Sequence, residues 1–426
     1  MAHSRRHRPH SSKRPFVPIL LGSDLSIYSL AQHIHRAWGM TSYTLSELPR
    51  GPVNNSAIVA PVFLGELAEA DVDSAYISAI NRIAEKHSPT PALVIPNTDG
   101  FVVLLDKARE AGRLAGNVVP VIGPAPQIYE ATNKAALARA LTRLGLPTVN
   151  EVEVPTGGPE QWDDLLGRVS YPAVIKSADG GTTFASLSFP GKEKVYFAPD
   201  RARAREIMEI VAAGGYTGSM LVQELIEGDD THSWVVSGYL DQAGTLTMAA
   251  SAQVIMNLHH ASLMGNAAAL YVRRNDELID EATALARELG LTGPFTVDVK
   301  IAPDGGHYYL DVNARVGRSC HFIYAGGINP VEIIAADLVE GRQLPERRAN
   351  DEAIYTIVPT WLIPRYLTDP ELKSRAWRAI RTRRVFHPLA YGRDLHPYRL
   401  AYRRINALNT ARRMLRDYPR QTPTSF

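Results

Sequence analysis

Apolar and polar positions follow one another in short blocks along the first part of the chain. Short apolar runs predict buried strands at residues 17–22, 57–63, 92–96 and 118–122. Helical spacing of apolar residues predicts helices at residues 26–38 and 73–86. Strands that alternate with helices favour a parallel sheet covered on both faces. We therefore expect an α/β domain over residues 15–125.

The pattern changes after residue 125. Apolar residues recur at helical spacing from Leu137 to Leu144, and Gly145 is a natural helix stop. The further elements that we expect are strands at 173–176 and 220–226, a helix at 277–289 and a strand pair at 294–313. This mixture predicts a second domain, of the α+β class, over residues 126–345.

Charge divides the chain in another way. Its 426 residues carry 46 Lys and Arg against 44 Asp and Glu, but residues 15–341 hold 23 against 37. Residues 342–426 hold 18 against seven, and their arginines lie around apolar residues at helical spacing. We expect residues 346–426 to form a basic helical region that meets an anion. Residues 1–14 carry five basic residues and no acid, and we interpret them as a disordered tail.

Composition excludes several classes of protein. Apolar residues make up 45% of the chain, which excludes disorder as its dominant state. The single Cys320 excludes an internal disulfide and a multi-thiolate metal site, and we expect it to be packed rather than catalytic. The apolar run at Phe16–Leu21 is too short for a signal peptide, and no run reaches the ~20 residues of a membrane span. We predict a cytoplasmic protein.

The first candidate site is an acidic hairpin. If Asp304-Gly305 form a two-residue turn, Asp298 lies directly opposite Asp311, and Asn313 shares their face. The other face is then apolar, formed by Val297, Val299, Leu310 and Val312. The alternative is a solvated hairpin, but like charges directly opposite each other destabilise a sheet unless a cation lies between them. Two carboxylates and an amide oxygen favour Mg²⁺.

A second candidate is the strand that ends at Lys176. A loop rich in glycine and hydroxyl residues follows it over 177–184. Its backbone N–H groups could cover phosphates while the lysine supplies a charge. An ordinary hairpin tip is an equally good interpretation of this motif alone.

A third candidate is the end of the strand at 220–226. Gln223, Glu224, Glu227 and Asp230 could present acceptors to adenine and ribose. Taken alone, a strand end running into a polar turn is the better interpretation. The Gly22-Ser23-Asp24 turn after the first strand lacks a dinucleotide-binding glycine pattern, and we interpret it as an edge that shapes a substrate cleft.

The order of these parts resembles the ATP-grasp superfamily. A helix lysine, Lys134, precedes Lys176 and its glycine-rich loop, then the acceptor cluster, then the hairpin ending Asp311-Val-Asn-Ala-Arg315. The resemblance covers residues 15–340. It implies an ATP-grasp fold preceded by a parallel-sheet α/β domain and followed by the basic helical region.

The resemblance also implies roles for the matching residues. Those that would contact ATP are Lys134, Lys176, Gly180, Gly181, Thr182, Gln223, Glu224, Ile226 and Asp230. Those that would hold Mg²⁺ are Asp298, Asp311 and Asn313, with Arg315 and Lys176 as catalytic residues. The family more often has Glu at the positions of Asp311 and Gln223, so the division of work between Gln223 and Glu224 stays open.

The activity implied is that of a carboxylate–amine ligase, which uses ATP and Mg²⁺ to make an amide through an acyl phosphate. The residues Ile19–Asp24 and Tyr28–Gln32 resemble the D-aspartate ligase group. That group attaches D-aspartate to a UDP-muramyl peptide in peptidoglycan precursor synthesis. The segment 251–271, with Gln253, His259, His260 and Asn266, lies where that group builds part of its substrate pocket.

Alternatives remain at this level. His259 and His260 could be polar loop residues. The chain could make a small dipeptide or a modified amino acid, or it could be an ATP-binding scaffold without turnover. Its C-terminal arginines could hold substrate carboxylates or a pyrophosphate, face solvent, or contact an anionic bilayer. Nucleic acid binding ranks below these, because no recognition motif accompanies the arginines.

Overall fold

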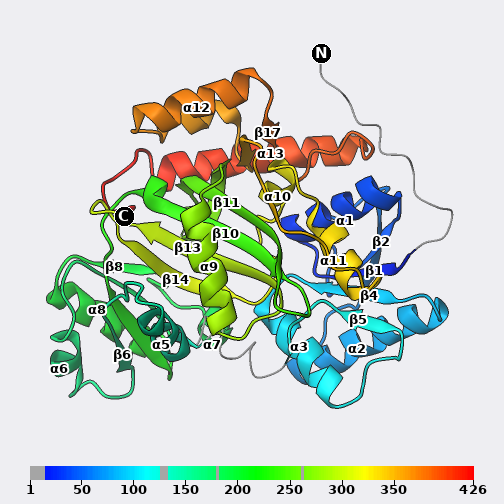
Figure 1. Ribbon diagram of the computed structural model, residues 1–426. Coiled ribbons are helices and arrows are strands. Elements are labelled where there is room, and N and C mark those ends of the chain that lie inside the picture. The colour runs from blue at the N-terminus through cyan, green and yellow to red at the C-terminus, as the bar shows by residue number, and fades with distance from the viewer. Residues whose placement is uncertain (1–14, 125–132, 179–181, 261–262) are drawn as a thin grey trace.

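Three sheets and a C-terminal helical region make up the molecule (Figure 1). The computed structural model describes residues 15–124, 133–178, 182–260 and 263–426. The predicted basic tail at 1–14 and the predicted phosphate-binding residues Gly180 and Gly181 lie outside the described residues. The domain boundaries expected at residues 125 and 345 stay predictions.

The first sheet has five parallel strands in the order β3-β2-β1-β4-β5. Its strands are β1 (Val17–Leu21), β2 (Ser42–Ser46), β3 (Val59–Phe63), β4 (Ala92–Pro96) and β5 (Val118–Pro120). Helices α1 (Leu25–Trp38), α2 (Glu69–Lys86) and α3 (Asp99–Glu110) connect them. The strand order reverses between β1 and β4, and in such sheets ligands bind beyond the carboxyl ends of the strands at this point.

Strand β2 was not predicted. Ser42 and Thr44 occupy buried positions in it, so its polar residues face inward and obscure the apolar pattern. The strands predicted at 17–22, 57–63, 92–96 and 118–122 are confirmed, with ends that differ by at most two residues. The prediction that all four are buried is wrong for β3 and β5, which are the edge strands of the sheet and are only partly buried.

The central sheet has eight strands and is mostly antiparallel. Along its path lie β14 (His307–Asn313), β13 (Gly293–Ile301), β10 (Ser233–Leu240), β11 (Leu246–Asn257), β12 (Ala267–Val272), β16 (Ala353–Thr356) and β17 (Val385–Phe386), and β15 (Arg347–Arg348) pairs with β11. Helices α5 (Lys134–Arg143) and α9 (Asp276–Glu288) pack on one face of this sheet. Helices α10 (His321–Ala325) and α11 (Pro330–Leu338) lie between it and the first sheet.

Strands β10 to β12 were also not predicted. They are buried along almost their whole length, so they lack the alternation that marks a half-exposed strand. Gly238 interrupts the apolar run of β10 because the Phe295 ring occupies the space of a side chain there. A Cβ added at Gly238 would lie 2.2 Å from Phe295 Cζ.

A small four-stranded antiparallel sheet stands apart, in the order β6-β9-β7-β8, at the lower left of Figure 1. Its elements are β6 (Glu151–Pro155), α6 (Trp162–Leu166), β7 (Ala173–Ser177), α7 (Thr182–Ser186), β8 (Tyr196–Ala198), α8 (Arg201–Ala213) and β9 (Ser219–Glu224), and η1 (Asp230–His232) leads from it into β10. It has its own apolar core. The functional cavity lies between this sheet and the central one.

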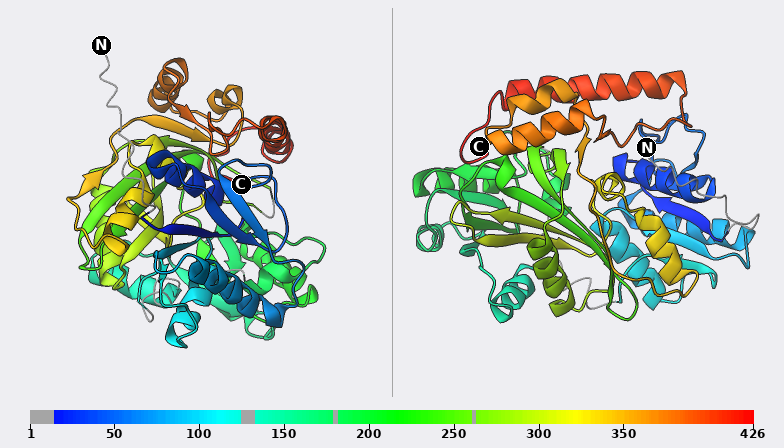
Figure 2. Two further views of the ribbon diagram at one scale, coloured as in Figure 1. Left: turned by 90° about the vertical axis from the view of Figure 1, so that its right-hand side faces the viewer. Right: turned by 45° about the horizontal axis from the view of Figure 1, so that its top comes forward.

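The predicted helical C-terminal region is confirmed. It consists of η2 (Thr360–Arg365), α12 (Pro370–Arg381) and α13 (Pro397–Asp417), and the last two run across the top of the molecule (Figures 1 and 2). A buried ion pair, Arg399 Nε to Asp394 Oδ2 at 3.0 Å, holds the start of α13. Arg399 also donates to the carbonyls of Pro52 and Asn54, and Asp394 accepts from Tyr28. These bonds attach α13 to the first domain.

Among the described residues, no helix is both long and apolar enough to cross a membrane.

Candidate active site

The acidic hairpin forms between β13 and β14, and its register is confirmed where it matters. Asp298 pairs with Asp311 and Thr296 with Asn313. The predicted two-residue turn is wrong, because Ala302 pairs with Gly306 across the three residues 303–305. A bulge between the pairs Asp298–Asp311 and Val299–Tyr309 restores the predicted pairing.

The bulge changes which residue faces the core. Leu310 was predicted on the apolar face, but it lines the cavity beside Asp311. Tyr309 takes the core position and is 2% exposed, with its hydroxyl donating to Glu281. An inserted residue shifts every side chain between it and the turn to the opposite face, and a hydrophobic pattern alone does not reveal it.

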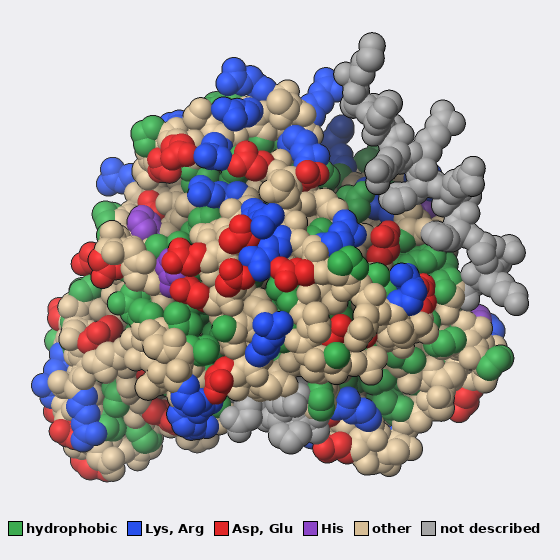
Figure 3. Space-filling view, viewed as in Figure 1, with side chains coloured by type: hydrophobic (Ala, Val, Ile, Leu, Met, Phe, Trp, Pro, Cys, Tyr) green, Lys and Arg blue, Asp and Glu red, His purple; other side chains and the backbone are tan. Residues whose placement is uncertain are grey.

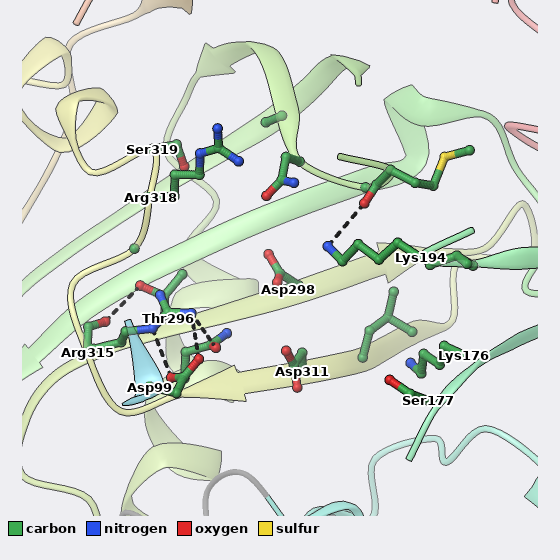
Figure 4. A pocket seen from close by; sticks show the side chains of 18 of the residues that line it. Asp99, Lys176, Ser177, Lys194, Thr296, Asp298, Asp311, Arg315, Arg318 and Ser319 are labelled. Carbon is green, nitrogen blue, oxygen red and sulfur yellow. Dashed lines mark hydrogen bonds and ion pairs between the residues drawn. The ribbon is translucent and has the colours of Figure 1, made fainter. Parts of the chain in front are cut away.

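The two carboxylates open into one large cavity of about 1710 Å³ (Figure 4). Both side chains are open to the cavity, but the protein atoms around them hinder their hydration. This desolvation, together with the negative charge of Asp311, raises the pKa of Asp298 to about 6. Desolvation also opposes ionisation of Asp311, but the positive charge and hydrogen bond of Lys134 outweigh it and lower the pKa of Asp311. Lys134 Nζ lies 2.8 Å from Asp311 Oδ1.

Two lysines approach the carboxylates from different elements. Lys134 begins α5 and also donates to the Leu310 carbonyl at 2.7 Å. Lys176, near the end of β7, donates to Gln223 Oε1 at 3.3 Å, and Gln223 donates in turn to Glu151 at 3.2 Å. Burial, and then the charge of Lys134, lowers the pKa of Lys176 to about 8. The structure thus brings the predicted lysines to the predicted acids.

Arg315 follows β14 and is held by the first domain. Its guanidinium makes two bonds to the Asp99 carboxylate, at 2.9 and 3.1 Å, and one to Asn313 Oδ1 at 2.9 Å. Asp99 was not predicted as a site residue. Its position in the chain could have indicated a role in the site. Asp99 begins α3 directly beyond the carboxyl end of β4, on one side of the point where the strand order reverses.

Lys194 is a second cavity residue that sequence analysis missed. It lies in the segment before β8, donates to the Met264 carbonyl at 3.2 Å, and lines the cavity across from Asp298 (Figure 4). Burial lowers its pKa, and the charge of Asp298 acts against that shift. No motif marks it in the sequence, because its neighbours are ordinary charged loop residues. With Arg318, it makes this side of the cavity positive.

The residues predicted to meet adenine and ribose lie outside the cavity lining. Gln223 accepts a hydrogen bond from Lys176 and donates one to Glu151. Glu224 accepts hydrogen bonds from the Asn150 side chain and from the Ser170 backbone. Ile226 follows β9 and also does not line the cavity, whereas Thr182 begins α7. In this structure Gln223 therefore orients Lys176 rather than facing the cavity itself.

Asp230 is wholly buried and its carboxylate is already bonded. It accepts from the Asn257 backbone at 2.7 Å and pairs with His259 Nε2 at 3.0 Å. His259 stacks on Tyr418, with ring centroids 3.6 Å apart. Asp230 is not among the residues that line the cavity, and its contact with ribose stays a prediction. Of the expected substrate-pocket residues, His260 and Asn266 line the cavity, whereas Gln253 and His259 do not.

The residues present fit Mg²⁺ and a nucleotide. Asp298 and Asp311 are paired across the hairpin and offer their carboxylate oxygens to one point of the cavity. Oxygen ligands of this kind suit Mg²⁺. Lys134 and Lys176 supply the positive charge that phosphates need. Cys320 is fully buried and burial raises its pKa, as expected for a packed thiol.

Comparison with known proteins agrees with this geometry. Residues 131–319 match the family model described as ATP-grasp domain, so the chain carries such a domain. ATP-grasp ligases form C–N bonds, and the fold and the site of this chain resemble theirs.

Particular relatives are distant. The D-aspartate ligase of Enterococcus faecium (strain Aus0004) is 24% identical over 393 residues, which cover 89% of this chain and 91% of that protein. The mitochondrial pyruvate carboxylase of Homo sapiens is 23% identical over 260 residues, covering 60% of this chain and only 21% of the longer enzyme. Among solved structures, the L-amino acid ligase from Bacillus licheniformis superposes with a TM-score of 0.54 at 18% identity, covering 77% of this chain and 75% of that one.

Proposed function

We propose that this protein is an ATP-dependent ligase that joins a carboxylate to an amine through an acyl phosphate. The observation that carries the proposal is the pairing of Asp298 with Asp311 in one cavity with Lys134, Lys176 and Arg315. A binding-only protein would not need two opposed carboxylates within reach of three cations.

Each residue has a defined part in this reaction. Lys134 and Lys176 bind the phosphates of ATP, and Asp298, Asp311 and Asn313 hold Mg²⁺, which neutralises phosphate charge when bound. A carboxylate oxygen of the first substrate attacks the γ-phosphorus, and ADP leaves. The amine then attacks the acyl carbon, and phosphate leaves with that same oxygen. Arg315, kept in place by Asp99, stabilises the charge that spreads over the transferred group.

D-Aspartate, or a similar amino acid, is the acid that we propose, and a peptidoglycan precursor peptide is the acceptor. The likeness to a D-aspartate ligase over 89% of the chain supports this choice. Lys194 and Arg318 offer cations for the carboxylate of aspartate that does not react. Formation of a small dipeptide is the alternative. Since ATP and Mg²⁺ are cytoplasmic supplies, we place the reaction in the cytoplasm.

Hydroxamate formation tests the proposal. Hydroxylamine replaces the unknown amine and traps an activated acyl group, so the protein is incubated with Mg-ATP, hydroxylamine and a panel of D- and L-amino acids and other carboxylic acids. We expect a hydroxamate with D-aspartate above all other acids. A hydroxamate with another acid alone would keep the ligase and refute the specificity. No hydroxamate and no ADP with any acid, added peptide acceptors included, would favour a scaffold.

A second proposal concerns the outer surface of the C-terminal helices. Trp377 on α12 and Ile405 and Leu408 on α13 are 42%, 58% and 55% exposed, and Arg404 and Arg412 flank the last two. Figure 3 shows Lys and Arg side chains, interspersed with acidic ones, over α12. Apolar side chains among arginines suit the surface of an anionic bilayer.

Co-sedimentation with phosphatidylglycerol-containing vesicles tests this contact. We expect the protein to sediment with the vesicles at low salt, and the double substitution Ile405→Asp, Leu408→Asp to weaken binding about tenfold or more. Leu48→Asp, at a side chain that is 47% exposed on the first domain, is the matched control and should bind as the wild type does. Equal binding of all three proteins would refute the contact.

A further inference from the structure

A second, smaller cavity of about 250 Å³ adjoins the active-site cavity. The two cavities share wall residues Leu25, Leu258, His260, Arg318 and Ile357. Ser23 and Asp24 form its edge directly beyond the carboxyl end of β1. It therefore lies at the point where the strand order of the first sheet reverses, where open parallel sheets bind their ligands.

Helix α13 forms the opposite wall. Tyr402, Asn406, Thr410 and Arg413 line the cavity, and their spacing of four, four and three residues puts them on one stripe of the helix. The exposed Ile405, Leu408 and Arg412 belong to a different stripe, on the outer surface. The basic helix α13 thus has one stripe that faces the cavity and another that faces outward. Of its two adjacent arginines, Arg413 lines the cavity and Arg412 does not.

The cavity wall is positively charged. Arg50, Arg318 and Arg413 lie on it, and within the part of the chain that the structure describes none of their guanidinium groups forms an ion pair. The lining carboxylate, Asp24, is engaged in capping α1, since its Oδ1 accepts from the backbone N–H groups of Ser26 and Ile27 at 3.0 and 3.1 Å. Asp417 lies near Arg413 but forms its ion pair with Arg416, whose Nε lies 2.5 Å from Asp417 Oδ1.

The wall is also fixed in place. Arg399 anchors α13 to Asp394 and to the carbonyls of Pro52 and Asn54. The loop at Gly51 approaches α13 so closely that an added Cβ would lie 2.1 Å from Tyr402 Cε2. The two backbone segments that carry Arg50 and Arg413 are therefore fixed relative to each other, as a binding site requires.

We propose that this cavity binds an oxyanion, carboxylate or phosphate, of the amine substrate, so that α13 is part of the substrate site. Arg318, in the wall shared by both cavities, faces the reacting end, and Arg50 and Arg413 hold the distal anion through charge-assisted hydrogen bonds. The identification of the ligand as a substrate rests on the proposed function, whereas the existence of an anion site does not.

The test is calorimetric titration of the full chain with two probes, inorganic pyrophosphate and succinate. Excess Mg²⁺ and a non-hydrolysable ATP analogue are present throughout, to occupy the nucleotide phosphate site. We expect one of the probes to bind, and Arg413→Gln to weaken it about tenfold or more. The adjacent Arg412→Gln is the matched control and should bind like the wild type. Tighter pyrophosphate binding would identify a phosphate ligand, and tighter succinate binding a carboxylate.

Two results would overturn the inference. One is that neither probe binds the wild type, and the other is that Arg413→Gln and Arg412→Gln bind equally well. Failure of the nucleotide analogue to bind, with probe binding still sensitive to Arg413, would count against the proposed ligase and leave the anion site in place. Both arginines are exposed, and equal melting temperatures would show that the variants fold.

Discussion

Replacing Asp311 by Asn is expected to lower the rate of ATP-dependent amide or hydroxamate formation by roughly 100-fold or more. A 100-fold loss of rate corresponds to about 2.7 kcal/mol of lost transition-state stabilisation. Asp311 pairs with Asp298 across the hairpin and accepts from Lys134 at 2.8 Å. The substitution removes a carboxylate oxygen from the proposed Mg²⁺ site and leaves the shape of the side chain. Turnover is measured at saturating Mg-ATP.

Stability should respond in a different way. The substitution removes the ion pair with Lys134 but also relieves the repulsion with Asp298, and these two effects oppose each other, so the melting temperature of Asp311→Asn should change little. Asp304→Asn, in the turn of the same hairpin, is the matched control and should keep full activity. Full activity of Asp311→Asn would remove this residue from the catalytic account, and loss of activity only through unfolding would show a structural role.

The second large effect concerns pH and stability. His33 and His321 are buried and in contact, Nε2 to Nδ1 at 3.0 Å, and His387 has an enclosed Nε2 with no partner among the described residues. Burial, and then the charge of nearby arginines, lowers the pKa of His321 and of His387 to about 3. Burial lowers the pKa of His33 as well.

The direction of the effect follows from proton binding. The unfolded histidines take up protons near pH 6.5, whereas the folded ones stay neutral, so stability is lost as the pH falls below about 6.5. At pH 5 the loss is about 2 kcal/mol for each histidine with a pKa near 3, at 1.36 kcal/mol per pKa unit. Urea unfolding at pH 7.5 and pH 5.0 measures it.

A matched pair of variants isolates one histidine. His387 Nδ1 accepts from the Leu389 backbone, and the exposed His396 accepts from the Tyr398 backbone in the same way. Asn can replace either acceptor. We expect His387→Asn to reduce the stability difference between the two pH values by about 2 kcal/mol, and His396→Asn to leave it unchanged. Carboxylates that titrate in the same range contribute equally in all three proteins, so an unchanged difference in His387→Asn would contradict the prediction.

Sequence reasoning was most successful where local chemistry is decisive. The acidic hairpin motif predicted the pairing of Asp298 with Asp311 correctly, although the predicted turn is one residue too short. The bulge in β14 shifts the register back by one residue, so the predicted pair still forms. Helices with clear apolar spacing, such as α5 and α9, were predicted closely. The strands of the first sheet with continuous apolar runs were found, and β2, with its buried hydroxyl groups, was not.

It was less successful where contacts depend on tertiary structure. Asp99 reaches Arg315 from another domain, and Lys194 enters the cavity from a loop without a motif. Asp230 appeared available from its place after a strand, but His259 and Tyr418 enclose it, and the latter follows α13 far along the chain. Such long-range packing leaves no periodic pattern in the sequence.

Transfer of ¹⁸O from the acid to phosphate is the most direct test of the central claim. The acid selected by the hydroxamate panel is labelled at both carboxylate oxygens and converted with Mg-ATP and an amine. Attack of the carboxylate on the γ-phosphorus, followed by displacement of phosphate, predicts that each released phosphate carries one ¹⁸O atom. Phosphate without the label would contradict an acyl phosphate, and with it the assignment of this site to carboxylate–amine ligation.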